Sequence, residues 1–406
     1  MKMKDTELFQ LALSLMPPWM VERCVFDVSL KRLDLHIDFE RGGVFECPVC
    51  GRAGCKAYDT EEKTWRHLNF FEHETYLHAF VPRVQCPDCG IKTAAVPWAR
   101  PGSGFTLFFE ALVLALAKQM PVKAVATLVH EHDTRIWRIL HYHVNEARGR
   151  EDFSTVRRVG MDETSRKKGH RYVSFFVDMD RRKLLFGTPG KDAATVGAFA
   201  RDFKAHGGDP AQIREVSLDM SHALIQGVRE HLPNAQITFD KFHAVKLVND
   251  ALEEVRREEQ KSHHELKSSR YLWLRNPTNL KRDQHERLAV LLGQSHLKTG
   301  RAYRIKLAFQ DLYTQPVHTA RAYLGRWYFW ATHSRLPPII KAARTVKAHS
   351  DGILRWFHSG LTNAILEAIN SLIQAAKAKA RGYRSPQYLL TIAYLIAGQL
   401  TFNLPT

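Results

Sequence analysis

The stretch Arg157–Asp180 reads RRVGMDETSRKKGHRYVSFFVDMD, and it decides the fold of the chain. Two short apolar runs, Val159–Met161 and Tyr172–Val177, are joined by the polar, basic segment Thr164–Arg171, which is the pattern of a β-hairpin. The acidic pair Asp162–Glu163 follows the first run directly. A carboxylate at the end of a strand is held rigidly with its oxygens free, as a metal-dependent active site requires. Ordinary solvated turn residues are the alternative interpretation of this pair.

The residues after the hairpin alternate between strand and helix patterns. They predict a strand, a helix, a strand, a helix and a strand, near Lys183–Phe186, Thr195–His206, Ile213–Leu218, His222–His231 and Gln236–Phe239. The order β-β-β-α-β-α-β matches the ribonuclease-H-like fold. In its mixed sheet we expect Asp162 to lie beside Asp219, which ends the fourth strand, while Asp240 ends the fifth. Two such carboxylates can hold Mg²⁺, and a pair of ions could activate an attacking oxygen and stabilise a leaving one.

Composition describes a globular, basic protein. The 406 residues are enough for two or three domains, and the apolar and charged fractions, 45% and 25%, are those of a folded chain. Lys and Arg number 59 against 42 for Asp and Glu, and the net charge of +17 favours a polyanionic partner, most often nucleic acid. A basic protein of another function remains an alternative. No apolar stretch reaches the ~18 residues that span a bilayer, and no signal peptide is evident, so we expect a cytosolic protein.

Four of the six cysteines form two nearly identical pairs. Cys47-Pro-Val-Cys50-Gly and Cys86-Pro-Asp-Cys89-Gly each have the form of a zinc knuckle, in which the chain turns tightly so that backbone N–H groups face the sulfurs. Four thiolates make a closed, tetrahedral, structural zinc site with no open position for catalysis. Four reduced cysteines without metal are the alternative.

The spacing of the two knuckles leaves room for structure between them. The gap of 35 residues is longer than the usual 15–20 of a compact ribbon, and it can hold strands around Trp65–Phe71 and Tyr76–Val84. Three further side chains are possible substitute ligands, namely Cys55, His67 and His73. Before the first knuckle, residues 5–16 have helical spacing and residues 24–39 alternate, which indicates a small strand-rich platform.

The segment MPVKAVATLVHEHDTRIWRILHYHV, which follows the second knuckle, has the outline of a helix-turn-helix. Helices are predicted over Thr106–Lys118, Pro121–Val129 and Thr134–Val144, with a turn around His130–Asp133. The last of these helices could enter a major groove with one basic face, formed by Arg135, Arg138 and His141. A plain helical hairpin with a solvated basic face is the alternative.

The region after Asp240 changes to a charged, helical pattern. Helices are predicted over Lys281–Leu292, Ala302–Tyr313 and Ala320–Thr332. Trp273 lies beside Arg270 and could stack on an unpaired base, although a place in the core is the more frequent role of such a residue.

A further helix is predicted over Leu361–Ala380, where Asn363, Glu367 and Asn370 share a face. A solvated surface glutamate is the alternative for Glu367. A basic run without acids follows, and it is a candidate for phosphate contacts: Lys377, Lys379, Arg381 and Arg384. The last stretch, Ser385–Thr406, is predicted to pack as a buried helix.

Together these motifs resemble the DDE transposases of bacterial insertion sequences, of the type usually written ISL-three. The resemblance covers essentially the whole chain and rests on CPVCG, CPDCG, MPVKAV, GMDETSRKKGHRY, SLDMS, FDKFH and NAILEAIN. It implies a catalytic triad of Asp162 in GMDE, Asp219 in SLDMS and Glu367 in NAILEAIN, with Asp240 in FDKFH as a reserve metal ligand. Neighbouring groups that could support the site are Glu163, His170, His222 and His243.

The resemblance also implies an activity and an organisation. We expect an α/β protein with helical regions: a platform with the zinc module (1–98), a helix-turn-helix domain (99–150), a ribonuclease-H-like catalytic domain (151–250 and 351–406) and a long helical insertion (251–350). It would bind the terminal inverted repeats of its element and target DNA as a homodimer, on the nucleoid of a bacterial cytoplasm. It would cut DNA with two Mg²⁺ (or Mn²⁺) ions and carry one structural Zn²⁺. A regulator descended from a transposase and a structure-specific nuclease of the same fold are the alternatives.

Overall fold

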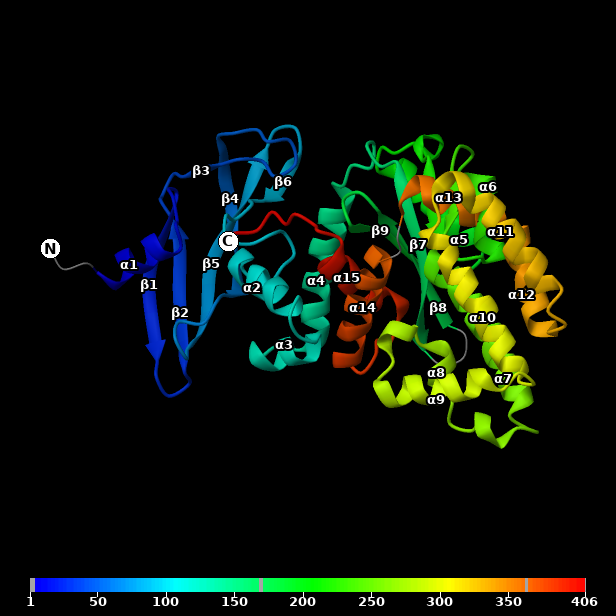
Figure 1. Ribbon diagram of the computed structural model, residues 1–406. Coiled ribbons are helices and arrows are strands. Elements are labelled where there is room, and N and C mark those ends of the chain that lie inside the picture. The colour runs from blue at the N-terminus through cyan, green and yellow to red at the C-terminus, as the bar shows by residue number, and fades with distance from the viewer. Residues whose placement is uncertain (1–3, 168–170, 362–363, 406) are drawn as a thin grey trace. The chain divides into compact units, whose positions relative to one another are not determined.

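The computed structural model describes residues 4–167, 171–361 and 364–405. The chain forms two compact units, Met1–Ala147 with Thr401–Thr406, and Arg148–Leu400, which are described in turn (Figure 1). In the described part of the chain, no helix is both long and apolar enough to cross a membrane.

The first unit begins with a helix and a six-stranded sheet. These elements are α1 (Asp5–Ala12), β1 (Trp19–Asp27), β2 (Arg32–Phe39), β3 (Val44–Phe45), β4 (Cys55–Arg66), β5 (Glu74–Cys86) and β6 (Gly90–Thr93). The strand order is β1-β2-β5-β4-β3, and β6 pairs with β5. The alternation predicted over residues 24–39 is confirmed, because Leu33, Leu35 and Ile37 of β2 are buried on one face.

One strand prediction in this unit is wrong. The strand expected around Trp65–Phe71 is the end of β4, which stops at Arg66. The chain then makes a tight turn in which Phe70 and His73 exchange backbone hydrogen bonds and Phe71 adopts a φ of 51°. A left-handed residue cannot continue a strand, so the apolar pattern of this segment belongs to a turn.

Three helices follow the sheet. They are α2 (Leu107–Ala117), α3 (Val122–Leu128) and α4 (Asp133–Gly149), close to the predicted ranges. The apolar face predicted for α4 is confirmed, because Ile136, Leu140 and Val144 are all buried. The fully buried Glu110 of α2 accepts hydrogen bonds from Arg100, at 3.0 Å, and from His143 of α4, at 2.6 Å. This charged contact holds α2 against α4.

The second unit is built on a five-stranded mixed sheet. Its strands and intervening helices are β7 (Arg158–Lys167), β8 (Arg171–Asp178), β9 (Lys183–Pro189), α5 (Ala193–Ala205), β10 (Glu215–Leu218), α6 (His222–His231) and β11 (Gln236–Phe239). The strand order is β11-β10-β7-β8-β9, with the hairpins β7-β8 and β8-β9 antiparallel and β10 parallel to both β7 and β11. The predicted order of elements and the adjacent placement of the first and fourth strands are confirmed.

The first strand differs from its prediction in length. It continues for five residues past Asp162, because Glu163, Thr164 and Ser165 pair with Ser174, Val173 and Tyr172 across the hairpin. Asp162 therefore lies within a strand and does not end it. The polar composition of Thr164–Lys167 concealed the strand, since only backbone pairing marks it.

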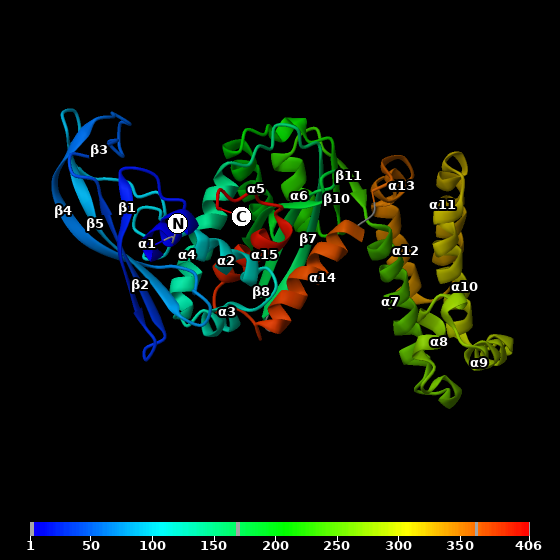
Figure 2. The same cartoon turned by 90° about the vertical axis from the view of Figure 1, so that its left-hand side faces the viewer.

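Helices cover both faces of this sheet. The side chains of Val159, Met161 and Phe176 pack towards α5 and α6 in one core cluster. The other face carries α14 (Ala364–Lys379) and α15 (Pro386–Ala397), and α14 runs along β7 (Figure 2). The helix can approach closely because Gly160 has no side chain: an added Cβ would lie 2.9 Å from the Leu366 side chain. The helix predicted over Ser385–Thr406 is confirmed in part as α15, which spans Pro386–Ala397, whereas residues 398–405 are not helical.

A long helical segment separates β11 from α14. It comprises α7 (Lys241–Glu259), α8 (Arg270–Leu274), α9 (Arg282–Gly293), α10 (Lys298–Asp311), α11 (Val317–Thr332), α12 (Pro337–Ala348) and α13 (Ser350–Ser359). Short 3-10 helices punctuate the second unit: η1 (Pro210–Gln212), η2 (His264–Leu266), η3 (Pro277–Asn279) and η4 (Leu312–Thr314). Trp273 is fully buried and donates to Ser269 Oγ at 2.9 Å, so the core interpretation of this residue holds and the base-stacking one does not.

Candidate functional site

The four knuckle cysteines come together in the first unit. The Sγ atoms of Cys47, Cys50, Cys86 and Cys89 all lie within 4.8 Å of one another. Both knuckles use their glycine for a left-handed turn, with φ of 71° at Gly51 and 73° at Gly90, a conformation that side chains disfavour. The three substitute ligands that the sequence offered, Cys55, His67 and His73, are not part of this group of described residues.

The backbone around these sulfurs favours a thiolate at Cys47. The N–H groups of Cys50 and Val49 lower the pKa of the Cys47 thiol to about 6. The pKa of Cys89 is raised, first by its hydrogen bond with Cys50 and then by burial. Cys47 and Cys86 are almost completely buried. Four sulfurs so close together, with N–H groups directed at them, fit a structural zinc ion.

An acidic edge forms where three strands of the second unit end or pass. Ser217 of β10 pairs with Gly160 of β7, and Leu218 pairs with Phe239 of β11. Asp219 and Asp240 follow their strands directly, and Asp162 lies two residues beyond Gly160. In-register parallel strands bring the three aspartates to one level of the sheet.

Helix α14 completes this edge from the other side. Asn370 donates a short hydrogen bond to Asp162 Oδ2, and Gln374 donates one to Thr164 Oγ1. Asn370 and Gln374 are four residues apart on the helix, which is a rise of about 6 Å, and Asp162 and Thr164 are two residues apart on the strand, which is a rise of about 6.7 Å. Because the two spacings are similar, successive turns of α14 can contact successive residues on one face of β7. Glu367 precedes Asn370 by three residues and therefore lies on the same face of α14. Asn363, predicted for this face, lies outside the described residues.

Glu367 is exposed and borders a cavity of about 800 Å³ that is also lined by Asp240, Lys241 and Phe242. The carboxylates of Asp162, Asp219 and Glu367 are not all within 4.8 Å of one another; among the described residues, only the four cysteines and one histidine–glutamate group are so close. In sites that hold two metal ions the ions lie ~3.5–4 Å apart, so the ligands of such a site are spread more widely than those of a single ion.

The electrostatics of the edge favour a cation. Burial raises the pKa of Asp162, and repulsion from Asp219 adds to it, against the lowering effects of the Glu163 N–H, His243 and Asn370. Burial and the charge of Asp219 raise the pKa of Glu163 to about 7. Asn370 Oδ1 is buried and accepts no hydrogen bond within the described chain. Repelling carboxylates beside an unsatisfied amide oxygen offer the oxygen ligands that Mg²⁺ prefers.

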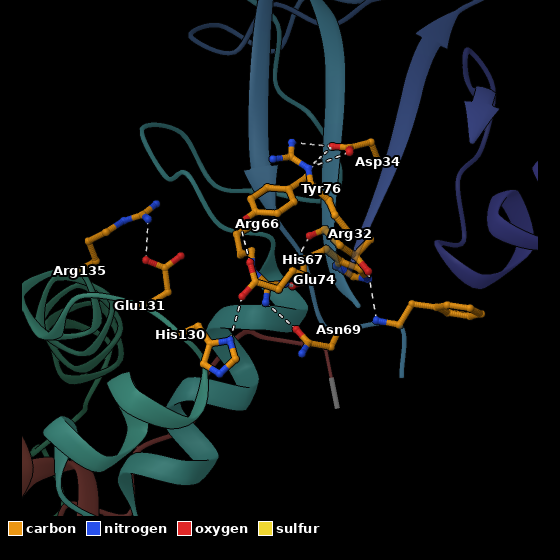
Figure 3. Close-up of polar contacts among 12 residues, drawn as sticks. Arg32, Asp34, Arg66, His67, Asn69, Glu74, Tyr76, His130, Glu131 and Arg135 are labelled. Carbon is orange, nitrogen blue, oxygen red and sulfur yellow. Dashed lines mark hydrogen bonds and ion pairs between the residues drawn. The ribbon is translucent and has the colours of Figure 1, made fainter. Parts of the chain in front are cut away.

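The turn before α4 is fastened to the sheet of the same unit. His130, at the turn, has a φ of 54°, and its Nδ1 lies 2.9 Å from Glu74 Oε1 at the start of β5 (Figure 3). Glu74 also accepts from Tyr76, and it lies 3.9 Å from the buried guanidinium of Arg66. These contacts fix the beginning of α4 relative to the sheet that carries the cysteines.

The predicted basic face of α4 is only partly available. Arg138 is exposed, whereas Arg135 pairs with Glu131 at 2.6 Å and its guanidinium lies 4.3 Å from the centre of the Phe105 ring. The ring of His141 stacks on Trp137, and burial lowers its pKa.

Comparison with known proteins decides what these features belong to. A family model described as a transposase of the ISL3 type matches residues 159–393, more than half of the chain. The chain belongs to the ISL3 family of transposases. The helix-turn-helix domain of transposase family ISL3 matches residues 94–144, and the zinc-finger of the transposases of IS204, IS1001, IS1096 and IS1165 matches residues 43–89.

Two relatives support this assignment over most of the chain. The transposase for insertion sequence element IS1557 of Mycobacterium tuberculosis is 32% identical over an alignment of 386 residues, and the match covers 85% of each chain. The transposase for insertion sequence element IS1001 of Bordetella parapertussis is 30% identical over 359 residues, 85% of this chain and 87% of that one. The predicted resemblance is therefore confirmed.

The remaining predicted residues of this transposase have varied surroundings. Lys377 donates to the Ser165 carbonyl at 2.6 Å and thus joins α14 to β7, whereas Lys379, Arg381 and Arg384 are exposed. His243 Nδ1 lies 3.5 Å from Asp240 Oδ2. The side chain of His170 lies outside the described residues.

Sequence reasoning missed two contacts of this transposase. Gln374 follows Asn370 at the spacing of one helical turn, which was the available signal for its contact with Thr164. The pairing of His130 with Glu74 joins residues 56 positions apart and left no pattern in the sequence.

Proposed function

We propose that this transposase binds the terminal inverted repeats of its own element and performs metal-dependent DNA cleavage and strand transfer. The observation that carries the proposal is the acidic edge, where Asp162 lies in β7, Asp219 directly follows the neighbouring strand β10, and Asn370 of α14 contacts Asp162. The family assignment gives the class of reaction.

Each part of the edge has a chemical role in this proposal. Asp162, Asp219 and Glu367 would hold two Mg²⁺ or Mn²⁺ ions, which when bound activate the attacking oxygen and stabilise the leaving one. Asn370 holds the Asp162 carboxylate in one orientation through its amide N–H. Asp240 is the reserve ligand, because it follows the strand next to Asp219. No side chain acts as a covalent nucleophile; water and the released DNA 3′-OH attack in turn.

The first unit would provide recognition of the ends. A structural Zn²⁺ held by Cys47, Cys50, Cys86 and Cys89 would stabilise the sheet to which His130 fastens the turn before α4. The exposed Arg138, with Arg135 and His141, would face the major groove, and the basic end of α14 (Lys377, Lys379, Arg381 and Arg384) would contact phosphates. The net charge of +17 suits this partner.

The proposal includes the organisation inferred from the sequence. The domains would be 1–98, 99–150 and a ribonuclease-H-like domain of 151–250 and 351–406 that is interrupted by the helical insertion 251–350. The order β11-β10-β7-β8-β9, in which β8 alone runs antiparallel to the other four strands, supports that fold. A homodimer would bridge the two ends of the element in the bacterial cytoplasm.

A cleavage assay tests the proposal. The substrate is a duplex that contains the DNA flanking the gene on both sides, including its inverted termini, and the product is a 3′-OH at the end of the element. We expect cutting with Mg²⁺ or Mn²⁺, followed by joining of that end to a plasmid. Binding of the ends without any cutting would indicate a regulator, and preferential cutting of branched junctions without the termini would indicate a structure-specific nuclease. Either result overturns the proposal.

A further inference from the structure

A second group of side chains suited to a metal ion lies in the helical segment of the second unit. Ligand atoms of His263, Glu265 and His296 are all within 4.8 Å of one another. His263 and Glu265 belong to the connection between α7 and α8, where Glu265 is part of η2, and His296 belongs to the connection between α9 and α10. The motifs on which the family resemblance rests do not include these residues, and the proposed DNA chemistry does not use them.

Two distances in this group are close to those between ligands of one metal ion. Glu265 Oε1 lies 3.2 Å from His263 Nδ1 and 3.7 Å from His296 Nε2, so one carboxylate oxygen faces both imidazoles. The centroids of the His263 and His296 rings are 5.1 Å apart, and the ring planes are inclined by 37° to each other. Ligands on a tetrahedral zinc ion, with bonds of about 2.0–2.1 Å, are separated by about 3.3 Å. A small inward movement of the side chains would therefore place all three around one ion.

The backbone on both sides of the group is already fixed. Leu266, next to Glu265, and Leu297, next to His296, are buried in the core. The carboxylate of Glu259 accepts hydrogen bonds from the N–H groups of Lys298 and Thr299, both at 2.7 Å, and thereby ties the end of α7 to the start of α10. The ligand set is thus held in place by contacts that do not depend on an ion, which reduces the entropy lost on binding.

We propose that His263, Glu265 and His296 bind a first-row transition-metal dication, foremost Zn²⁺, which links the α7–α8 connection to the α9–α10 connection. Two imidazoles and one carboxylate suit zinc, whereas Mg²⁺ prefers oxygen ligands only. The three side chains are between 34% and 56% exposed, so water would complete the coordination and the ion would exchange more readily than one held by four cysteines.

Zinc titration of the full-length transposase tests this proposal, with bound metal measured by equilibrium dialysis and elemental analysis. We expect two zinc ions per chain in the parent protein and one in His296→Ala. The matched control is His264→Ala. His264 is an exposed histidine of η2, the 3-10 helix that contains Glu265, but it is not one of the three proposed ligands. This variant should therefore still bind two zinc ions. Glu265→Gln, which is nearly isosteric, should weaken the second site at least ten-fold. Circular dichroism verifies that each variant is folded.

Cobalt(II) separates the two sites spectroscopically. The first equivalent should give thiolate charge-transfer bands, and the second should add ligand-field bands without further thiolate absorption, in the parent protein but not in His296→Ala. The proposal would be overturned if the parent protein bound one zinc ion per chain, or if His264→Ala and His296→Ala lost the same amount of bound zinc. The readout is metal content and not DNA cleavage, so it stands apart from the proposed function.

Discussion

The cysteine cluster and the acidic edge are both metal sites in our account, but they are assembled in opposite ways. The four cysteines come from two short knuckles whose Sγ atoms already lie within 4.8 Å of one another. The acidic edge combines three neighbouring strands with α14, a helix that follows them by more than a hundred residues, and the carboxylates of Asp162, Asp219 and Glu367 are not gathered so closely.

The surroundings of the ligand atoms also differ between the two sites. Local turns direct N–H groups at the sulfurs and lower the pKa of Cys47, so the cysteine cluster is closed and ready for one ion. At the acidic edge, burial and repulsion from Asp219 raise the pKa of Asp162 and Glu163, and a bound cation would relieve this repulsion. A structural metal site has all its coordination positions filled by the protein, whereas a catalytic metal site keeps a position for water or substrate.

The largest expected effect concerns the acidic edge. Asp219→Asn and Glu367→Gln should each reduce cleavage of the element's ends about a thousand-fold or more, equivalent to ~4 kcal/mol of transition-state stabilisation, because each would remove a charged ligand of the proposed metal ions. Binding of the ends, measured by gel shift, should be unchanged. The comparison variant is Asp240→Asn. If it abolishes cleavage while Glu367→Gln retains it, Asp240 and not Glu367 is the third ligand.

The next effect concerns the closed site. Cys86→Ser should release zinc and weaken binding of the ends about a hundred-fold, because structural zinc contributes about 10 kcal/mol to the folding of small modules. Cys24→Ser, at a half-buried cysteine outside the cluster, is the control and should retain both. Zinc content and gel shift measure the two properties. Retention of end binding by a zinc-free Cys86→Ser protein would mean that the cluster does not support recognition.

A smaller effect is expected from the contact that orients Asp162. Asn370→Leu removes the N–H donor at nearly constant volume, and we expect a ten- to hundred-fold loss of cleavage, as is usual when a group that orients a metal ligand is replaced. The Mg²⁺ concentration needed for half-maximal rate should rise as well, which a loss of stability alone would not cause. Leu372→Ala, at an exposed position of the same helix, should alter neither quantity.

The smallest effect is a pH dependence in the first unit. Burial, with the charge of Arg66, lowers the pKa of His67 to about 4, so the folded state disfavours protonation there. Because the folded pKa lies below the value of 6.5 in an unfolded chain, this stability is complete above pH 6.5 and is lost as the pH falls towards 4. We expect a loss of about 1–2 kcal/mol between pH 7 and pH 5.

Urea denaturation measures this loss in the zinc-loaded protein. The loss between the two pH values should be smaller in His67→Gln, which can still bond to Thr106 Oγ1 but does not titrate. His132→Gln, at an exposed histidine, should behave as the parent does. Equal losses in all three proteins would show that His67 does not contribute.

The sequence predicted what periodicity and short motifs encode. The elements from β7 to β11 follow from alternating apolar patterns, and the cysteine cluster follows from two copies of one knuckle. Both are local signals, because each depends on neighbours a few residues away along the chain.

What escaped prediction depends on contacts between distant segments. The end of β7 is a polar stretch that becomes a strand only through pairing with β8. Trp273 lies among basic residues, but the packing of the helical segment buries it. The contacts of Asn370 with Asp162 and of His130 with Glu74 join residues that the fold alone brings together. The sequence could place such residues on a face but not select their partners.

The central claim is that Asp162, Asp219 and Glu367 share a pair of divalent ions. The most direct measurement is the anomalous scattering of manganese in crystals of the transposase bound to a cut end of its element. Our account predicts two manganese peaks about 4 Å apart, with ligands from all three carboxylates. Peaks bound by Asp240 or Glu163, with Glu367 directed elsewhere, would contradict it.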